Sequence, residues 1–127
     1  MTKMINVPEM KVGVVAVSRD CFLIELSQKR YKEVLAECEK LGLPVLSCET
    51  IIESGADALS AIDEMNSKGV NAVTVYLGNF GPEGPATIFA ERMGVPFMLC
   101  GASEESADSL LADRGDAYCG MLNASIN

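Results

Sequence analysis

The chain contains no histidine and no tryptophan among its 127 residues. Without histidine it can form neither a Ser-His-Asp triad nor a Cys-His nucleophile pair, and it offers no imidazole as a metal ligand. It also lacks the one side chain whose unperturbed pKa lies near neutrality. Any catalysis by this chain would therefore have to use carboxylates, lysines, tyrosines or thiols.

Basic residues and long apolar runs are also scarce. The 10 Lys and Arg residues are outnumbered by 18 Asp and Glu, which gives a net charge of −8, and no cluster of basic residues offsets it. The negative electrostatic field of such a chain would repel phosphate backbones, so we expect no nucleic-acid partner. Apolar runs such as Val12–Val17 are far shorter than the roughly 20 residues of a membrane span. With no apolar signal segment near Met1, we expect a cytoplasmic protein without a membrane partner.

The five cysteines lie at positions 21, 38, 48, 100 and 119, with no CxxC pair. The odd number and the spacing argue against a disulfide framework and against a thiolate zinc site. Cys38 lies on the apolar stripe of a predicted helix, and Cys100 ends an apolar run, residues 96–100, that predicts a buried strand. Both are therefore predicted to be small buried side chains. Cys21 lies in a predicted loop beside Arg19, where a lowered thiol pKa would make it a candidate nucleophile, although no general base is evident nearby.

The length and the 49% apolar content predict one domain over residues 11–127, preceded by an arm at residues 1–10. Apolar runs and helical periodicities alternate along the chain, and glycines or serine caps mark the helix ends. They predict strands at 11–17, 45–48, 70–77 and 96–100 and helices at 31–41, 54–69, 86–93 and 103–114. A final segment repeats apolar residues at helical spacing: Tyr118, Leu122 and Ile126.

This alternation predicts a three-layer α/β fold, a Rossmann-like or flavodoxin-like open parallel sheet in the order 2-1-3-4 with helices on both faces. In the second helix we expect Leu59 to face inward with Ala58, Ile62 and Met65. In the fourth helix, Leu110 and Leu111 are the expected inward residues.

Ligands of open α/β sheets bind beyond the carboxyl ends of the strands. This rule selects the loops at 18–22, 78–85 and 101–103, and no GxGxxG or GxxxxGK[ST] motif accompanies them. Arg19 could bind a carboxylate or a polyol through its planar fork, and Phe80 could form an apolar wall. Alternatively, Arg19 pairs with Asp20 or Glu25 and Phe80 only covers a loop. Two further carboxylates, Glu83 and Glu91, are expected to be solvated.

Three segments together suggest a family: Val17-Ser-Arg-Asp-Cys-Phe22, the stretch from Val73 to Gly84, and Gly115-Asp-Ala-Tyr-Cys-Gly-Met-Leu-Asn-Ala-Ser125. They resemble the N-terminal domain of L-fucose and L-arabinose isomerase-like proteins. The resemblance implies that Arg19, Asn79 and Phe80 contact a sugar substrate across a subunit boundary in a homo-oligomer. It also implies a divalent metal, usually Mn²⁺, whose ligands lie in later domains and have no counterpart in this chain.

We therefore expect the first domain of an aldose–ketose isomerase-like protein, contributing substrate contacts and subunit packing, with no metal site, no catalytic residue and no activity of its own. The alternative is a free-standing α/β module that binds a small ligand or a protein through the same crevice. A third reading is a thiol enzyme centred on Cys21.

Overall fold

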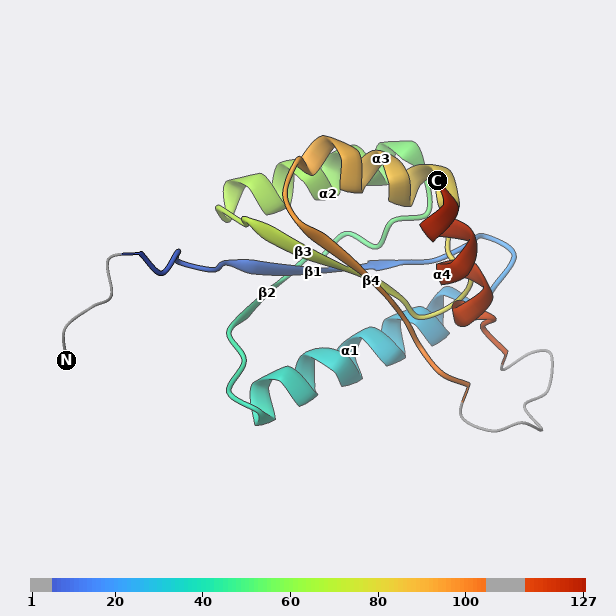
Figure 1. Cartoon of the computed structure of the whole chain (residues 1–127). Helices are drawn as coiled ribbons and strands as arrows, with labels where there is room; N and C mark the ends of the chain where they lie inside the picture. Colours follow the sequence, from blue (N-terminus) through green and yellow to red (C-terminus); the bar gives the residue numbers. More distant parts are fainter. Residues whose placement is uncertain (1–5, 105–113) are drawn as a thin grey trace.

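A computed structural model of the chain describes residues 6–104 and 114–127 (Figure 1). Strands and helices alternate along the chain. The elements are β1 (Val12–Val17), α1 (Ile24–Lys40), β2 (Val45–Ser47), α2 (Gly55–Ser67), β3 (Ala72–Leu77), α3 (Glu83–Met93), β4 (Phe97–Gly101) and α4 (Ala117–Ile126). None of the helices in the described ranges is long and apolar enough to cross a membrane.

The four strands form one parallel sheet in the order β2-β1-β3-β4, which confirms the predicted fold. β1 and β3 lie in the centre, with Val14 opposite Thr74 and Val17 opposite Leu77. Helix α1 covers one face of the sheet, and α2 and α3 cover the other (Figure 1). The central strands are buried between these layers, which explains their near-continuous run of β-branched residues.

The local signals at the helix ends are largely confirmed. Ser54 and Asp57 form the expected capping box at the start of α2. Gly94 ends α3 in the left-handed conformation, with φ of 61°. Helix α3 begins at Glu83, earlier than the predicted residue 86, with Pro85 in its first turn. Proline fits there because the first N–H groups of a helix have no partner within the helix.

Two burial predictions are wrong. Leu59 is 46% exposed, because its side chain lies on the solvent side of α2. The 96–100 strand is not buried: it forms the edge of the sheet, where Phe97 and Met98 are 54% and 57% exposed. Cys100 on the same strand and Cys38 on α1 are only partly buried. The predicted order 2-1-3-4 correctly placed this strand at one end of the sheet, but its continuous apolar run indicated burial that an end strand does not have.

The predicted fourth helix falls largely on residues 105–113, including Leu110 and Leu111, which lie outside the described residues. The final segment forms α4, as its periodicity suggested, but the residues that define that periodicity face solvent. The face that packs inward consists of small residues, Ala117, Gly120 and Ala124. A Cβ on Gly120 would lie 1.7 Å from the carbonyl oxygen of Phe80, so only glycine allows this approach.

Candidate ligand-binding site at the switch point of the sheet

The strand order reverses between β1 and β3, because α1 leaves β1 on one face while α3 leaves β3 on the other. The loops after these two strands therefore meet at the carboxyl end of the sheet, beside α4 (Figure 1). Such a switch point is where ligands of doubly wound folds bind. The structure brings Arg19, Asn79 and Phe80 together here, as their positions after β1 and β3 predicted.

Asn79 ties the two loops to each other. Its side chain is 0% exposed. Its Oδ1 accepts hydrogen bonds from the backbone N–H groups of Arg19 (3.0 Å) and Gly81 (3.2 Å), and its Nδ2 donates to Ser18 Oγ (2.8 Å). Asn79 therefore sets the position of both loops from beneath the surface.

Arg19 lies against an aromatic pair. Its guanidinium carbon is 4.9 Å from the centroid of the Phe80 ring. The rings of Phe80 and Phe22 are nearly parallel, with centroids 6.2 Å apart. Sequence reasoning did not include Phe22 in the site, although it stands three residues after Arg19. The three side chains present a cation and a broad apolar wall at the same point.

The partner of Arg19 is Glu83, and not Asp20 or Glu25. Arg19 Nη1 lies 3.4 Å from Glu83 Oε1, with the two side chains 36% and 24% exposed. Glu83 also accepts a hydrogen bond from Asn123 Nδ2 on α4. The prediction that Glu83 is merely solvated is therefore wrong. As the first residue of α3, its carboxylate also lies at the positive end of that helix.

A buried arginine supports the loop from the other side. Arg30 on α1 is only 4% exposed. Its Nη1 donates to the carbonyl oxygen of Gly78 (2.7 Å), and its Nη2 donates to Glu104 Oε2 (3.1 Å). Glu104 in turn accepts from the backbone N–H groups of Gly115 (3.1 Å) and Asp116 (2.9 Å). This chain of bonds joins α1, the loop after β3 and the start of α4.

Sequence reasoning missed Arg30, because the predicted helix began at residue 31, whereas α1 begins at Ile24, and because arginine side chains are seldom buried. The one local signal was its position: it lies three residues after Ser27 and directly before Tyr31, both of which are buried. Gly115 allows the contact, since a Cβ there would lie 2.8 Å from Arg30 Nη1.

The thiols do not form a second centre among the described residues. Cys21 is exposed near Arg19. Cys48, at the end of β2, is buried and donates from its Sγ to Glu64 Oε2 at 3.2 Å. Burial raises the pKa of the Cys48 thiol to about 12, with a further rise from Glu64. Cys48 is therefore protonated at neutral pH and unsuited to act as a nucleophile.

A metal requires several ligands at one point. In residues 6–104 and 114–127, no three Cys, Asp or Glu side chains come close enough to hold an ion. The described residues thus do not fit Mn²⁺.

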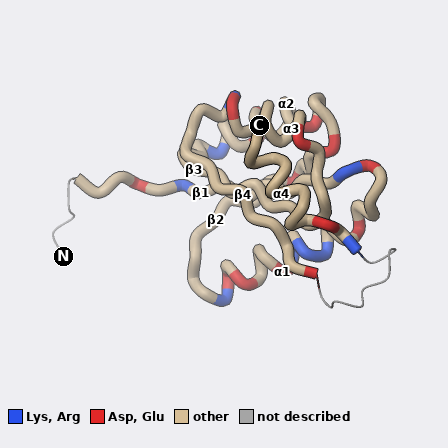
Figure 2. The backbone as a smooth tube through the Cα atoms, turned by 45° about the vertical axis from the view of Figure 1, so that its right-hand side comes forward, with Lys and Arg blue, Asp and Glu red and all other residues tan. Residues whose placement is uncertain are grey.

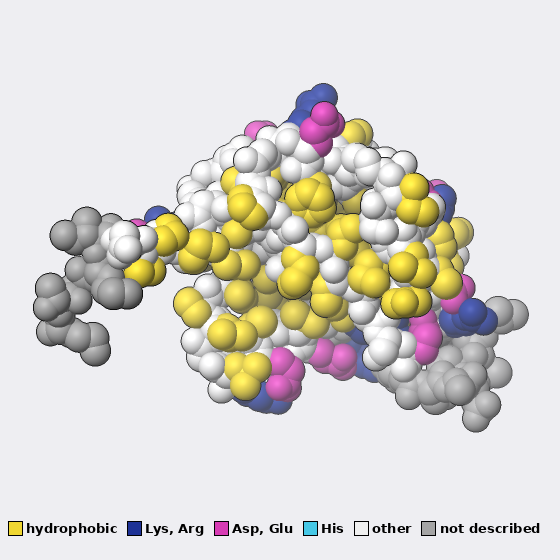
Figure 3. All heavy atoms as spheres, viewed as in Figure 1, with side chains coloured by type: hydrophobic (Ala, Val, Ile, Leu, Met, Phe, Trp, Pro, Cys, Tyr) yellow, Lys and Arg dark blue, Asp and Glu magenta, His cyan; other side chains and the backbone are white. Residues whose placement is uncertain are grey.

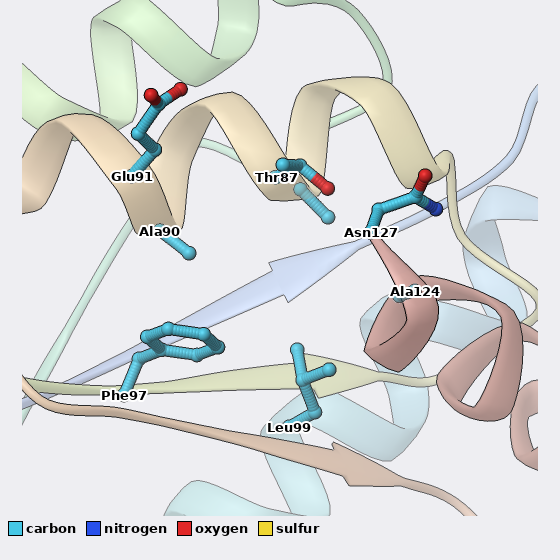
Figure 4. Close-up of a pocket in the computed structure, with 8 residues that line it drawn as sticks. Thr87, Ala90, Glu91, Phe97, Leu99, Ala124 and Asn127 are labelled. Atoms are coloured by element: carbon cyan, nitrogen blue, oxygen red, sulfur yellow. The ribbon is translucent and has the colours of Figure 1, made fainter.

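A separate hollow of about 360 Å³ lies between α3, β4 and α4 (Figure 4). Its walls include Ala90, Phe97, Leu99 and Ala124, with Glu91 at the rim. It contains none of the switch-point residues. Its lining is mostly apolar, with Thr87, Glu91 and Asn127 as the polar side chains. The candidate site remains the pair of loops around Arg19, because they lie at the switch point of the sheet.

The strand order and the helices on both faces define the chain as a doubly wound α/β domain. Residues 13–127 match the family model described as "fucose/sulfoquinovose isomerase, N-terminal domain". The chain belongs to this family, which confirms the resemblance to the N-terminal domain of fucose isomerase-like proteins. A comparison with curated proteins found no match.

Proposed function

We propose that this domain provides substrate contacts to an aldose–ketose isomerase and that the metal-dependent chemistry is supplied by other domains of such a protein. The family match supports the reaction class, since it covers nearly the whole chain. The observation that carries the proposal is the cluster of Arg19, Phe80 and Glu83 at the switch point. We further propose that the crevice caps the active site of a neighbouring subunit in a homo-oligomer.

The chemistry of this cluster suits a polyhydroxyl ligand. The guanidinium of Arg19 can donate to hydroxyl oxygens, and the carboxylate of Glu83 can accept from hydroxyl hydrogens. The phenyl rings of Phe22 and Phe80 offer a wall for the C–H groups of a sugar ring. In this proposal Arg19 and Phe80 contact the sugar, and Asn79 acts through the two loops that it joins.

The family description names two sugars of different charge. Fucose is a neutral deoxy sugar, whereas sulfoquinovose carries a sulfonate. Both are aldoses, so the isomerisation is the same in each case and the difference lies in the recognition of one substituent.

In this proposal the subunits of the homo-oligomer pack against one another through the side of the molecule formed by β4 and α4. Neither β4 nor α4 contains a charged residue, although 22% of the chain is charged (Figure 2). Large apolar side chains gather over these elements (Figure 3). Those exposed there are Phe97, Met98, Tyr118, Leu122 and Ile126. An uncharged apolar face on a chain of charge −8 lets two copies approach without strong repulsion.

The substrate-contact proposal is tested by titrating the ¹⁵N-labelled chain with L-fucose and following amide shifts. We expect weak binding, with shifts concentrated in residues 18–22 and 79–83, and reduced shifts in Arg19→Gln. The control is Lys32→Gln, which removes an exposed cation of α1. Shifts confined to other parts of the chain would contradict the assigned site. Turnover of aldoses by this chain with added Mn²⁺ would show that it is active alone, contrary to the proposal.

A further inference from the structure

We propose that Glu83 makes the crevice selective for uncharged sugars over sugars that carry a sulfonate or another anionic group. This inference rests on the proposed function, because it assigns a substrate class to the same site. Its basis is the position of the Glu83 carboxylate, which lies next to both positively charged groups of the site, the Arg19 guanidinium and the amino end of α3.

The first of these features is Arg19. Its Nη1 is 3.4 Å from Glu83 Oε1, so an anion that approaches the guanidinium also approaches a carboxylate. The second is the amino end of α3, where unpaired N–H groups attract anions. Glu83 is the first residue of that helix, so its own charge is already placed there.

The remaining charges do not restore a positive field. Among the described residues of the two loops and the first turn of α3, Arg19 is the single cation and stands against two carboxylates, Asp20 and Glu83. Arg30 lies beneath the loop, but it is 4% exposed and its charge is matched by Glu104 at 3.1 Å. A sulfonate at this point would thus meet a neutral or negative surrounding.

Glu83 is also fixed in place. Asn123 Nδ2 donates to the same Oε1 atom that faces Arg19. Asn123 belongs to α4, which approaches the loop after β3 so closely that a Cβ at Gly120 would meet the Phe80 backbone. Glu83 therefore cannot swing away from Arg19 without losing a contact between α3 and α4. An anion would have to displace a carboxylate that is held from two sides.

A neutral sugar needs no such displacement. One of its hydroxyl groups can donate to Glu83 while a neighbouring hydroxyl oxygen accepts from Arg19, so the ion pair serves as a paired acceptor and donor. Removing the negative charge of Glu83 would free Arg19 to bind a sulfonate as a charge-assisted, two-pronged partner.

The experiment compares two ligands on two variants by NMR titration: L-fucose, which is neutral, and sulfoquinovose, which is sulfonated. We expect the unmodified chain to bind L-fucose more tightly. In Glu83→Gln the affinity for sulfoquinovose should rise by about three- to tenfold, as expected for one charge at a partly exposed site, while that for L-fucose is unchanged or lower. The matched control is Glu91→Gln, which makes the same change of net charge at an exposed position of α3 outside the crevice.

The outcomes separate this inference from the proposed function. If neither sugar shifts resonances of the crevice, the proposed function fails and the inference with it. If both bind there but Glu83→Gln leaves the ratio of their affinities unchanged, or changes it only as much as Glu91→Gln does, the selectivity inference alone is wrong. Should Glu83→Gln fail to fold, the unmodified chain still decides, because tighter binding of sulfoquinovose than of L-fucose would overturn the proposal.

Discussion

Gly120 gives the sharpest test of how α4 joins the rest of the fold. Glycine within a helix is normally less favourable than alanine by about 0.5–1 kcal/mol. Gly120→Ala would therefore stabilise a helix that stood free. In this structure the new Cβ would lie 1.7 Å from the carbonyl oxygen of Phe80 and 2.4 Å from its carbonyl carbon.

These two atoms belong to the backbone of a loop that Asn79 holds in place, so they cannot rotate away as a side chain would. To restore van der Waals separation, α4 would have to withdraw by more than about 1.5 Å. That movement would also loosen the contact between Asn123 and Glu83. Overpacking of this kind outweighs the gain in helix propensity, and we expect a net loss of about 2 kcal/mol or more.

The matched variant is Gly84→Ala, near the start of α3, where a Cβ meets no atom within 4 Å. Here we expect a gain of about 0.5 kcal/mol, so the two substitutions should have opposite signs. Urea denaturation followed by circular dichroism gives the free energy of unfolding, and amide hydrogen exchange reports the protection of α4. If Gly120→Ala were as stable as Gly84→Ala and kept its protection in α4, the close packing of α4 on the loop would be refuted.

Two further predictions concern the pH dependence of stability and self-association. Burial raises the pKa of Glu64, but hydrogen bonds from Glu49 N–H, Lys68 and neighbouring groups outweigh it and lower the pKa from 4.5 to about 2. Because the pKa of Glu64 is lower in the folded chain than in the unfolded one, its stabilisation is complete above pH 4.5 and is lost as the pH falls toward 2. Denaturation curves should therefore show that the free energy of unfolding falls less over this pH range in Glu64→Gln than in the unmodified chain. The same pH dependence in both proteins would contradict the assignment. The β4–α4 face should cause self-association that Ile126→Asp weakens and Leu59→Asp, an exposed leucine of α2, does not. Light scattering that shows only monomers at high concentration would refute this prediction.

The candidate site was partly predictable because it follows from topology. A run of β-branched residues such as Val12–Val17 marks a buried parallel strand, and residues that follow such strands lie at the carboxyl edge of the sheet. Arg19 and Phe80 could be chosen on that basis. Their partner Glu83 could not, because no periodicity in the sequence connects residues 64 positions apart.

For the same reason the sequence did not show which side of α4 would face solvent. Helical spacing in the final segment correctly indicated α4, but the large residues Leu122 and Ile126 face solvent. The usual rule places large apolar residues inward. It fails here because α4 packs so closely on the loop after β3 that only small residues such as Gly120 fit between them.

The sequence by itself determined the class of fold and the order of its elements, since strand runs, capping residues and terminal glycines act over a few neighbouring residues. Through the missing histidine and the scarcity of basic residues, it also limited the chemistry of the chain. Only the tertiary structure decided that Phe97 and Met98 of β4 are exposed, that Arg30 is buried beneath the loop after β3, and that Glu83 pairs with Arg19. These features depend on which distant segments meet and how closely, and that is set by the packing of the whole sheet and its helices.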